Sequence, residues 1–402
     1  MPLERPQFHF PRPRQVLADF GGAYAAAAVV AFLFSATGPV AIILSIGAAG
    51  GLSDSDIASW IFGGFFLTSL ISIGFSLAYR QPLVFLWSIP GAVILGPALG
   101  HLSFPEVIGA FLVAGAVMLL LGLSGWVRRA MDAVPMPIVM AMVAGVFLRF
   151  GVGLVQAFTQ DLAIALSMTV TWLALSSLSG LARRVPPLIG ALVVGAVVIA
   201  FEGSFKPGPG ALFAIASPTI YTPQFSWPAI VELVVPLVIT VLTVQNAQGI
   251  AILTTNGHKP PTNAITVACG VGALVTGLVG AVTTCLTGPV NAVISTAGEK
   301  QRQYTAALFV AVLAMAFGLM APFFTRLLLA TPPAFIATLA GLAMLRILQS
   351  AFTASFAGRW SFGALVCFVV TVADVAIFRI GAPFWGLVLG VAASRLLERD
   401  QP

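Results

Sequence analysis

Long apolar stretches, separated by glycine, proline or charged residues, follow one another along almost the whole chain. Each is about as long as a helix needs to cross a bilayer, whereas membrane strands would show shorter segments of alternating hydrophobicity. The pattern therefore predicts an all-α integral membrane protein with about 14 membrane segments. They are expected at residues 22–49, 57–79, 83–99, 105–125, 135–157, 161–182, 187–201, 229–254, 262–281, 283–297, 304–323, 333–351, 360–379 and 382–397.

A polar, proline-rich connector at residues 202–228 divides these stretches into seven and seven. We therefore expect a first repeat at 21–201 and a second at 229–397. Because seven is odd, the second half must enter the membrane upside down relative to the first. The first twenty residues, 1–20, lack an apolar core and a small-residue cleavage site, so they are interpreted as a tail and not as a signal peptide.

Two short similarities between the halves support an inverted repeat. The segment Pro90–Ile94 in the third stretch resembles Pro289–Ile294 in the tenth. Likewise, Ala144–Arg149 in the fifth stretch resembles Ala340–Arg346 in the twelfth. Both matches are in register with the order of the segments, which favours a common architecture for the two halves.

The composition excludes a water-soluble protein. Of the 402 residues, 59% are hydrophobic and only 8% are charged, whereas soluble domains carry about a quarter charged residues. So few polar residues cannot cover a soluble exterior, which excludes soluble enzymes, nucleic-acid binders and disordered scaffolds. The cysteines lie inside apolar stretches without paired spacing, so neither a disulfide, a metal site nor a cofactor is indicated. They are Cys269, Cys285 and Cys367.

The net charge of +6 is an orientation signal and not a nucleic-acid footprint. With the amino terminus in the cytoplasm, 15 of the 19 lysines and arginines, Arg346 among them, fall on the cytoplasmic side of the predicted segments. This asymmetry is the positive-inside pattern of membrane proteins. Both termini are therefore expected in the cytoplasm, and the connector on the other side.

The third and tenth stretches are expected to hold a substrate. Transporters with inverted repeats bind substrate at the midplane, between broken helices whose ends face it. Helices that begin at Pro90 and Pro289 would direct free N–H groups toward the centre, which suits an anion held without a cationic side chain. Alternatively, both segments are merely kinked structural helices.

Polar residues near these breaks are candidate ligands. Three amides lie within Gln245–Gln248 and cannot all face one neighbour, so some are expected to line a cavity; the alternative is hydrogen bonding between helices. The predicted substrate-binding residues are Thr37, Ser88, Pro90, Gly91, Gln245, Asn246, Thr287, Gly288 and Asn291. The predicted apolar wall comprises Phe34, Phe85 and Trp87, which in such chains also face lipid or the core.

Two charged residues lie inside predicted membrane segments, Arg149 in the fifth and Asp374 in the thirteenth. An unpaired charge in hydrocarbon is costly, so each should have a partner. We expect the two to pair with each other, or Asp374 to pair with Arg379. No catalytic residue is predicted.

Several motifs, taken in order, resemble the benzoate:proton symporter (BenE-type) family, and the similarity runs from about residue 20 to residue 397. The motifs are Arg80–Pro82, Trp87–Ala92, Gly122–Gly125, Ala144–Gly151, Gln245–Leu253 and Ile380–Leu387. The resemblance implies proton-coupled uptake of a small aromatic carboxylate such as benzoate across the bacterial inner membrane. It also implies the fold of uracil permease, in which segments 1–4 and 8–11 form a core and segments 5–7 and 12–14 a gate.

The partners implied are a small organic anion, protons and the lipid bilayer, without nucleic acid; a homodimer is left open. Alternatives in the same class are a nucleobase permease and a transporter of another organic or inorganic anion. Uracil permease-like proteins are expected to hold a base with glutamates, so the amides here favour an anion. An integral-membrane enzyme lacks support because acidic and histidine clusters are missing from the sequence. A passive channel is the remaining alternative.

Overall fold

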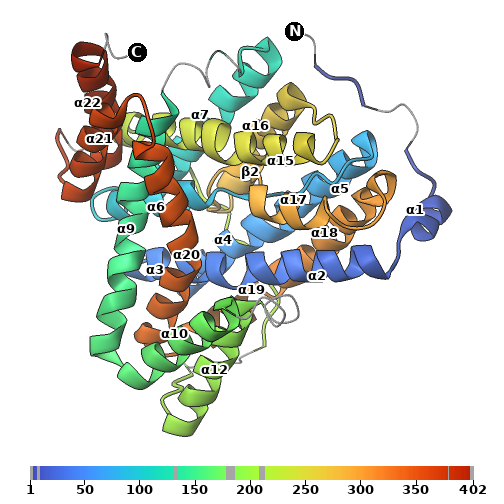
Figure 1. Cartoon of the computed structure of the whole chain (residues 1–402), viewed down its shortest axis with the longest axis horizontal. Helices are drawn as coiled ribbons and strands as arrows, with labels where there is room; N and C mark the ends of the chain where they lie inside the picture. Colours follow the sequence, from blue (N-terminus) through green and yellow to red (C-terminus); the bar gives the residue numbers. More distant parts are fainter. Residues whose placement is uncertain are drawn as a thin grey trace.

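The computed structural model describes residues 3–6, 10–127, 129, 135–177, 186–207, 213–378 and 380–398, and these form a predominantly helical molecule (Figure 1). Seven helical segments in this part of the chain are long and apolar enough to cross a membrane, and six further apolar helices have 10–17 residues. The prediction of a helical, multi-pass membrane protein is therefore confirmed.

The elements follow the expected stretches closely. The first half contains α1 (Pro13–Asp19), α2 (Gly22–Ala36), α3 (Gly38–Ala49), α4 (Asp54–Phe62), α5 (Thr68–Tyr79), β1 (Phe85–Trp87), α6 (Ile89–Ala98), α7 (Phe104–Ser124), α9 (Met136–Gln160), α10 (Leu162–Ser177) and α12 (Pro187–Glu202). The second contains α13 (Trp227–Ala229), α14 (Val235–Ile239), α15 (Ala247–Thr255), α16 (Thr262–Gly277), β2 (Thr284–Leu286), α17 (Gly288–Ile294), α18 (Tyr304–Leu319), α19 (Ala321–Leu329), α20 (Pro333–Phe356), α21 (Ser361–Ala373) and α22 (Ala382–Leu397).

Irregularities in three of these segments have local causes. The first stretch breaks at Thr37, where Gly38 and Pro39 begin α3. The helix α21 ends at Ala373, earlier than predicted, because Asp374 adopts a left-handed backbone conformation with φ of 55°. The segment Trp227–Thr255 contains two π-helical turns, Ile230–Val234 and Thr240–Asn246, and such turns occur frequently at functional sites.

Two short strands, which the sequence analysis did not predict, join the two halves of the chain. Strand β1 pairs antiparallel with β2, and Phe85 lies opposite Leu286. Each strand leads directly into a short helix, β1 into α6 and β2 into α17. Because the strands are antiparallel and only three residues long, α6 and α17 begin close together and leave the ladder in opposite directions. The predicted helix starts near Pro90 and Pro289 are therefore confirmed.

Side chains satisfy the outer edges of this buried ladder. Ser72 Oγ on α5 accepts the N–H of Phe85 at 2.8 Å and lies 3.0 Å from its carbonyl oxygen. Ser76 Oγ, one turn later, is bonded in the same way to the N–H and carbonyl of Leu83 at 3.2 and 3.1 Å. Backbone groups without partners are costly away from water, so these serines stabilise the strand.

The helices pack in two groups. In one, which we call the α9/α20 group, α9 packs along α20, α21 lies against α9 and α22, and α10 and α12 pack together beside α20 (Figure 1). In the other, the strand group, α7 packs against α16 and α18 packs against α2 and α5 around the ladder. This group also includes α3, α6, α17 and the segment Trp227–Thr255 with its two π-helical turns. Glycine permits close approach in the first group, since a Cβ at Gly341 would overlap Leu154 and one at Gly145 would overlap Thr371.

The described end of the connector is tied to the ends of the helices that it crosses. The backbone N–H of Gln224 donates to Pro105 O at 2.9 Å, and that of Thr219 donates to Ser59 Oγ at 3.0 Å. The hydroxyl of Tyr221 donates to a carboxylate oxygen of Asp56. Burial, together with this bond, raises the pKa of Tyr221, so the phenol stays protonated and remains a donor.

An ion pair links two helices of the α9/α20 group. Arg149 Nη2 on α9 lies 2.5 Å from Asp374 Oδ1 at the end of α21, and both side chains are about half exposed. The expectation that these two residues pair is confirmed. The alternative partner, Arg379, lies outside the described residues.

We expect Asp374→Asn to lower the yield of folded protein, because it leaves Arg149 charged without its partner. In hydrocarbon that exposure costs about 2.5–3.5 kcal/mol, and less where water reaches the pair. Size-exclusion chromatography of detergent extracts measures the yield. The double variant Arg149→Gln/Asp374→Asn should recover much of the loss because no lone charge remains. Strong loss of affinity for the expected anion in Asp374→Asn would instead place Asp374 in a ligand site.

Candidate substrate site

A cavity of about 410 Å³ lies between the two helix groups, at the starts of α6 and α17. The strand group contributes the two helix starts and the second π-helical turn with the residues after it, and the α9/α20 group contributes α9 and α20. The lining residues are Ile89, Pro90, Met136, Met140, Val143, Phe147, Thr243, Val244, Gln245, Ala247, Gln248, Pro289, Arg346, Ile347, Ser350 and Ala354. The cavity extends to Met136, where α9 begins, and to Ala354 near the end of α20.

Local sequence explains why both helices start at the cavity. Ser88 caps α6, and its Oγ accepts the N–H of Gly91 at 3.1 Å. Proline follows in the first turn of each helix, at Pro90 and Pro289, where its missing N–H costs nothing. At Gly288 a Cβ would overlap the side-chain amide of Gln248, so a larger residue here would displace that amide. The positive ends of two helix dipoles thus lie at the cavity.

Two of the three neighbouring amides face the cavity, as expected from their spacing. Gln245 is 7% exposed, and its side chain makes no hydrogen bond to any residue that the structure describes. Gln248 also lines the cavity. A buried amide without a partner is unfavourable unless water or a ligand bonds to it. Gln245 is therefore the strongest neutral candidate for contact with a ligand.

Arg346 supplies a positive charge that the sequence analysis did not place here. It lies within α20, lines the cavity and has no acidic partner among the described residues. The cavity thus contains a cationic side chain, whereas the sequence analysis expected an anion held without one. The sequence did contain a sign of this position, because Arg346 ends the segment Ala340–Arg346, which resembles Ala144–Arg149. The equivalent charge at Arg149 is neutralised by Asp374, whereas that of Arg346 remains available.

Asn291 and Asn246 do not line the cavity, and the prediction that they contact substrate is corrected. The Nδ2 atom of Asn291 donates to Val84 O at 3.1 Å and to Thr287 O at 2.7 Å, and its Oδ1 accepts from Val84 N at 3.0 Å. Both hydrogens on Nδ2 are used, so no donor remains for a ligand. Asn246 Oδ1 accepts the N–H of Leu286 at 2.8 Å. The two amides hold the strands in place.

Other predicted residues also serve the scaffold. Thr37 Oγ1 donates to Leu33 O at 2.8 Å within the break of the first segment. Thr287 lies at the start of α17, where its N–H donates to Val84 O at 3.1 Å. Ser88, Gly91 and Gly288 shape the helix starts beside the cavity without lining it. Of the nine predicted binding residues, Pro90 and Gln245 are among the lining residues.

The predicted aromatic wall is replaced by other residues. Phe85 packs edge-on against Phe75, and Trp87 packs against Gly64. Strand pairing, which the sequence did not reveal, buries both rings in the core. Phe34 is outside the cavity lining as well. The apolar surface comes instead from the α9/α20 group, with Met136, Met140, Val143 and Phe147.

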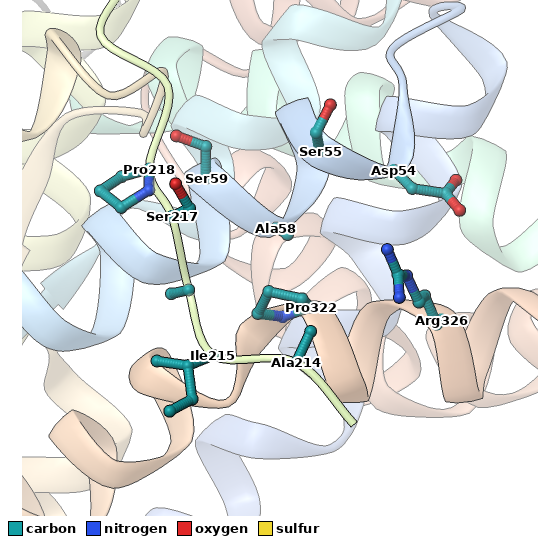
Figure 2. Close-up of a pocket in the computed structure, with 11 residues that line it drawn as sticks. Asp54, Ser55, Ala58, Ser59, Ala214, Ile215, Ser217, Pro218, Pro322 and Arg326 are labelled. Carbon is teal, nitrogen blue, oxygen red and sulfur yellow. The ribbon is translucent and has the colours of Figure 1, made fainter. Parts of the chain in front are cut away.

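A second pocket, of about 260 Å³, lies between the start of α4, the connector and α19. Figure 2 shows the guanidinium of Arg326 directed toward Asp54 across it, with Ser55 and Ser59 on the same helix. None of its lining residues belongs to the ladder or to the helices that follow the strands. The first cavity therefore matches the geometry expected of a site between broken helices.

The sequence matches the family model described as benzoate membrane transport protein over residues 18–396. Inner membrane protein YdcO of Escherichia coli (strain K12) is 29% identical over 371 residues, which cover 90% of this chain and 93% of the relative. The benzoate membrane transport protein of Acinetobacter baylyi is 27% identical over 383 residues, which cover 93% of this chain and 95% of the relative.

Solved membrane transport proteins share the fold. SLC26A9 superposes with a TM-score of 0.66 at 13% identity, over 92% of this chain and 64% of that chain. The transmembrane domain of the cyanobacterial bicarbonate transporter BicA has a TM-score of 0.61 at 16% identity, and the match covers 96% of this chain and 100% of that chain. Murine Slc26a9, an anion transporter in its inward-facing state, has a TM-score of 0.62 at 13% identity, and the match covers 92% of this chain and 68% of that chain. At these identities the likeness concerns the fold alone.

We expect Asn291→Ala to destabilise the protein, because the buried N–H of Val84 loses its acceptor, while Val84 O and Thr287 O each lose one of two donors. A buried group left unsatisfied costs about 1–3 kcal/mol. Thermal unfolding in detergent should show a clear decrease in midpoint. Gln245→Ala is the matched control, since this buried amide has no partner within the described chain, and its midpoint should stay near that of the parent. A normal midpoint for Asn291→Ala would show that its hydrogen bonds do not support the fold.

Proposed function

The chain belongs to the benzoate membrane transport protein family, and on this basis we propose that it carries a small aromatic carboxylate such as benzoate together with protons. Family membership makes it a membrane transporter and not an enzyme. The name of the Acinetobacter baylyi relative supports benzoate as the substrate. The name of the Escherichia coli relative supports a place in the inner membrane.

The chemistry of the cavity carries the proposal for an aromatic anion. Arg346 offers a guanidinium that can bind a carboxylate through two parallel hydrogen bonds. Gln245 and the positive ends of α6 and α17 lie on the opposite, strand-group side. Met140 and Phe147 provide apolar contacts for a ring. A substrate bound here would therefore bridge the two helix groups, its charge held by polar groups and its ring by α9.

A nucleobase permease fits this lining less well. No aspartate or glutamate is among the residues that line the cavity, whereas a neutral heterocycle with N–H donors favours a carboxylate acceptor. Arg346 would also remain without a counter-charge when a neutral base is bound. The cavity thus supports an anion, and competition with uracil distinguishes the two substrates.

We propose that the fourteen stretches are fourteen membrane segments in two inverted repeats, with both termini in the cytoplasm. The antiparallel ladder, with one strand and one short helix from each half, supports this arrangement. The strand group then corresponds to the core and the α9/α20 group to the gate. In this orientation the start of α9 and the end of α20 are cytoplasmic. The cavity accordingly faces the cytoplasm, and relative movement of the groups would open it to the other side.

Uptake by purified protein in lipid vesicles tests the function. Benzoate should accumulate when the outside is acidic, and a protonophore should abolish the accumulation. Protein-free vesicles correct for benzoic acid that crosses lipid unaided. Excess uracil should compete weakly or not at all. Protein-dependent uptake of uracil, with none of benzoate, would replace the proposed substrate by a nucleobase, and uptake that persists with the protonophore would contradict proton coupling.

Arg346→Gln should weaken benzoate binding by about ten- to a hundredfold, the effect of losing a hydrogen bond between two charged groups. Stability should change little because Arg346 has no acidic partner in the described chain. Isothermal titration measures the affinity, and thermal unfolding checks the fold. Arg395→Gln, an exposed arginine on α22 outside the cavity, is the control. Binding of benzoate by Arg346→Gln at the parental affinity would remove Arg346 from the site.

A further inference from the structure

A basic pocket of about 340 Å³ lies at the end of α5. Three loops build it: the residues after α5, the loop between α15 and α16, and the turn Lys300–Arg302. Its charged lining residues are the cations Arg80, Lys259 and Lys300, and no described aspartate or glutamate lines it. The basic pocket shares no lining residue with the substrate cavity, so it is a separate concentration of positive charge.

Hydrogen bonds to backbone carbonyls hold the loops of the basic pocket together. Gln81 Nε2 donates to Lys259 O at 3.0 Å, and Lys300 Nζ donates to Gly257 O at 2.6 Å. An ammonium group has three donors, so Lys300 keeps others for a ligand. Lys259 is exposed and, like Lys300, forms no ion pair within the described chain. Both lysines can therefore bind an anion without breaking a salt bridge.

The histidine of the basic pocket adds no charge to it. His258 is buried, and its Nε2 lies 2.7 Å from Gln303 Oε1. Because Gln303 Nε2 donates to Ser295 O and Ala297 O, the Oε1 atom is the acceptor and the imidazole is the donor. Burial lowers the pKa of His258, and the nearby Lys300 lowers it further, so the ring is neutral at about pH 7. The positive charge therefore comes from the arginine and the two lysines.

An apolar groove of about 430 Å³ adjoins the basic pocket, since Tyr79 lines both. One face of α5, which includes Ile71 and Phe75, forms one wall, and Val267 and Val271 of α16 form the other. Val271 is 43% exposed, and α5 belongs to a segment long and apolar enough to cross a membrane, so the groove opens toward hydrocarbon. From Ile71 to Tyr79 it follows α5 for about 12 Å.

The described part of the tail fixes the junction between the pocket and the groove. The hydroxyl of Tyr79 donates to Glu4 O at 2.8 Å, and Pro6 lines the groove. The carboxylate of Glu4 accepts the N–H groups of Asn263 and Ala264 at 3.1 and 3.0 Å. Its negative charge is thus directed to the start of α16. A tyrosine between an apolar and a polar region is typical of the membrane–water interface.

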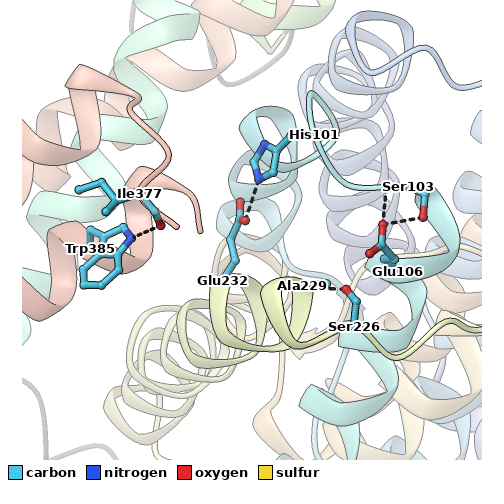
Figure 3. A network of polar contacts seen from close by, with 8 residues as sticks. All are labelled: His101, Ser103, Glu106, Ser226, Ala229, Glu232, Ile377 and Trp385. Atoms are coloured by element: carbon cyan, nitrogen blue, oxygen red, sulfur yellow. Dashed lines mark hydrogen bonds and ion pairs between the residues drawn. The ribbon is translucent and has the colours of Figure 1, made fainter. Parts of the chain in front are cut away.

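At the opposite end of α16, where α7 begins, the ionisable groups bond to neighbours within the protein. Figure 3 shows His101 beside Glu232, with Nε2 and Oε2 2.9 Å apart. It also shows Glu106 bonded to the N–H and hydroxyl of Ser103. These carboxylates have internal partners, whereas the two lysines of the basic pocket have donors left for a ligand.

We propose that the basic pocket and the groove together bind one anionic phospholipid. The phosphate of its headgroup contacts Arg80, Lys259 and Lys300, and one acyl chain lies between α5 and α16. Phosphate oxygens accept strong hydrogen bonds from ammonium and guanidinium groups, and basic pockets beside membrane helices bind anionic headgroups for this reason. A soluble phosphate would use the pocket alone, so the adjoining groove favours a lipid. This site is independent of the transported substrate.

Native mass spectrometry of the full-length protein in detergent measures the preference. Phosphatidylglycerol should bind at least about tenfold more tightly than phosphatidylcholine with the same chains, because each lysine contributes about fivefold. Lys259→Gln and Lys300→Gln should each weaken binding of phosphatidylglycerol by about that factor. Lys206→Gln is the matched control, since Lys206 is the remaining lysine of the chain and is exposed on the connector. Equal affinity for the two lipids, or an equal loss in Lys206→Gln, would overturn the proposal.

Gly74→Leu tests the place of the acyl chain. Gly74 lines the groove, and a Cβ there would meet no atom within 4 Å, so the leucine enters the groove without displacing a neighbour at its Cβ. Binding of phosphatidylglycerol should weaken severalfold. Gly153→Leu on α9, where a Cβ also meets no atom within 4 Å, is the control and should bind like the parent. Parental binding by Gly74→Leu would remove the chain from the groove and overturn the proposal.

Glycerol phosphate distinguishes the two sources of a phosphate group. It carries the anion without an acyl chain, so at equal concentration it should not displace phosphatidylglycerol from the parent protein. Displacement at equal concentration would assign the basic pocket to a soluble phosphate and overturn the lipid site.

Discussion

The arrangement of this protein depends on how unpaired backbone groups are satisfied where two membrane segments are broken. In a bilayer, every N–H and carbonyl must find a partner inside the protein. Strands β1 and β2 provide partners for each other. The amides of Asn246 and Asn291 and the hydroxyls of Ser72 and Ser76 satisfy the remaining edges. Because the ladder is fixed in this way, α6 and α17 can begin in the interior with their positive ends free to act on a ligand.

Both helix groups contribute residues to the cavity. The strand group supplies helix ends and a neutral amide, Gln245, on a scaffold fixed by buried hydrogen bonds. The α9/α20 group supplies Arg346 and the apolar wall. Under the proposed function, an amphipathic anion would contact both groups, and its binding would be coupled to their relative position.

Much of the fold could be predicted because hydropathy marks membrane segments strongly. The helix starts at Pro90 and Pro289 could be predicted from proline and glycine, and the pairing of Arg149 with Asp374 from the cost of a lone charge. The strands could not, since three residues show no usable alternation. Without the strands, the sequence predicts Phe85 and Trp87 in the cavity wall and Asn291 in contact with the ligand. The spacing of the amides predicts that they face different neighbours, but it could not tell that Gln245 faces the cavity and Asn246 faces β2, because that depends on the strands.

The pairing of the two strands also has a consequence for biosynthesis. Phe85 pairs with Leu286, which emerges from the ribosome 201 residues later, so β1 has no partner strand until then. At about 5–20 residues per second, the third segment spends on the order of 10–40 s in the membrane before its partner exists. Ser72 and Ser76 precede it in the chain and can already bond one edge of β1 during this interval. The two hydroxyls on α5 would thus first bond the edge of β1 during synthesis, acting as an intramolecular chaperone, and later form part of the folded core.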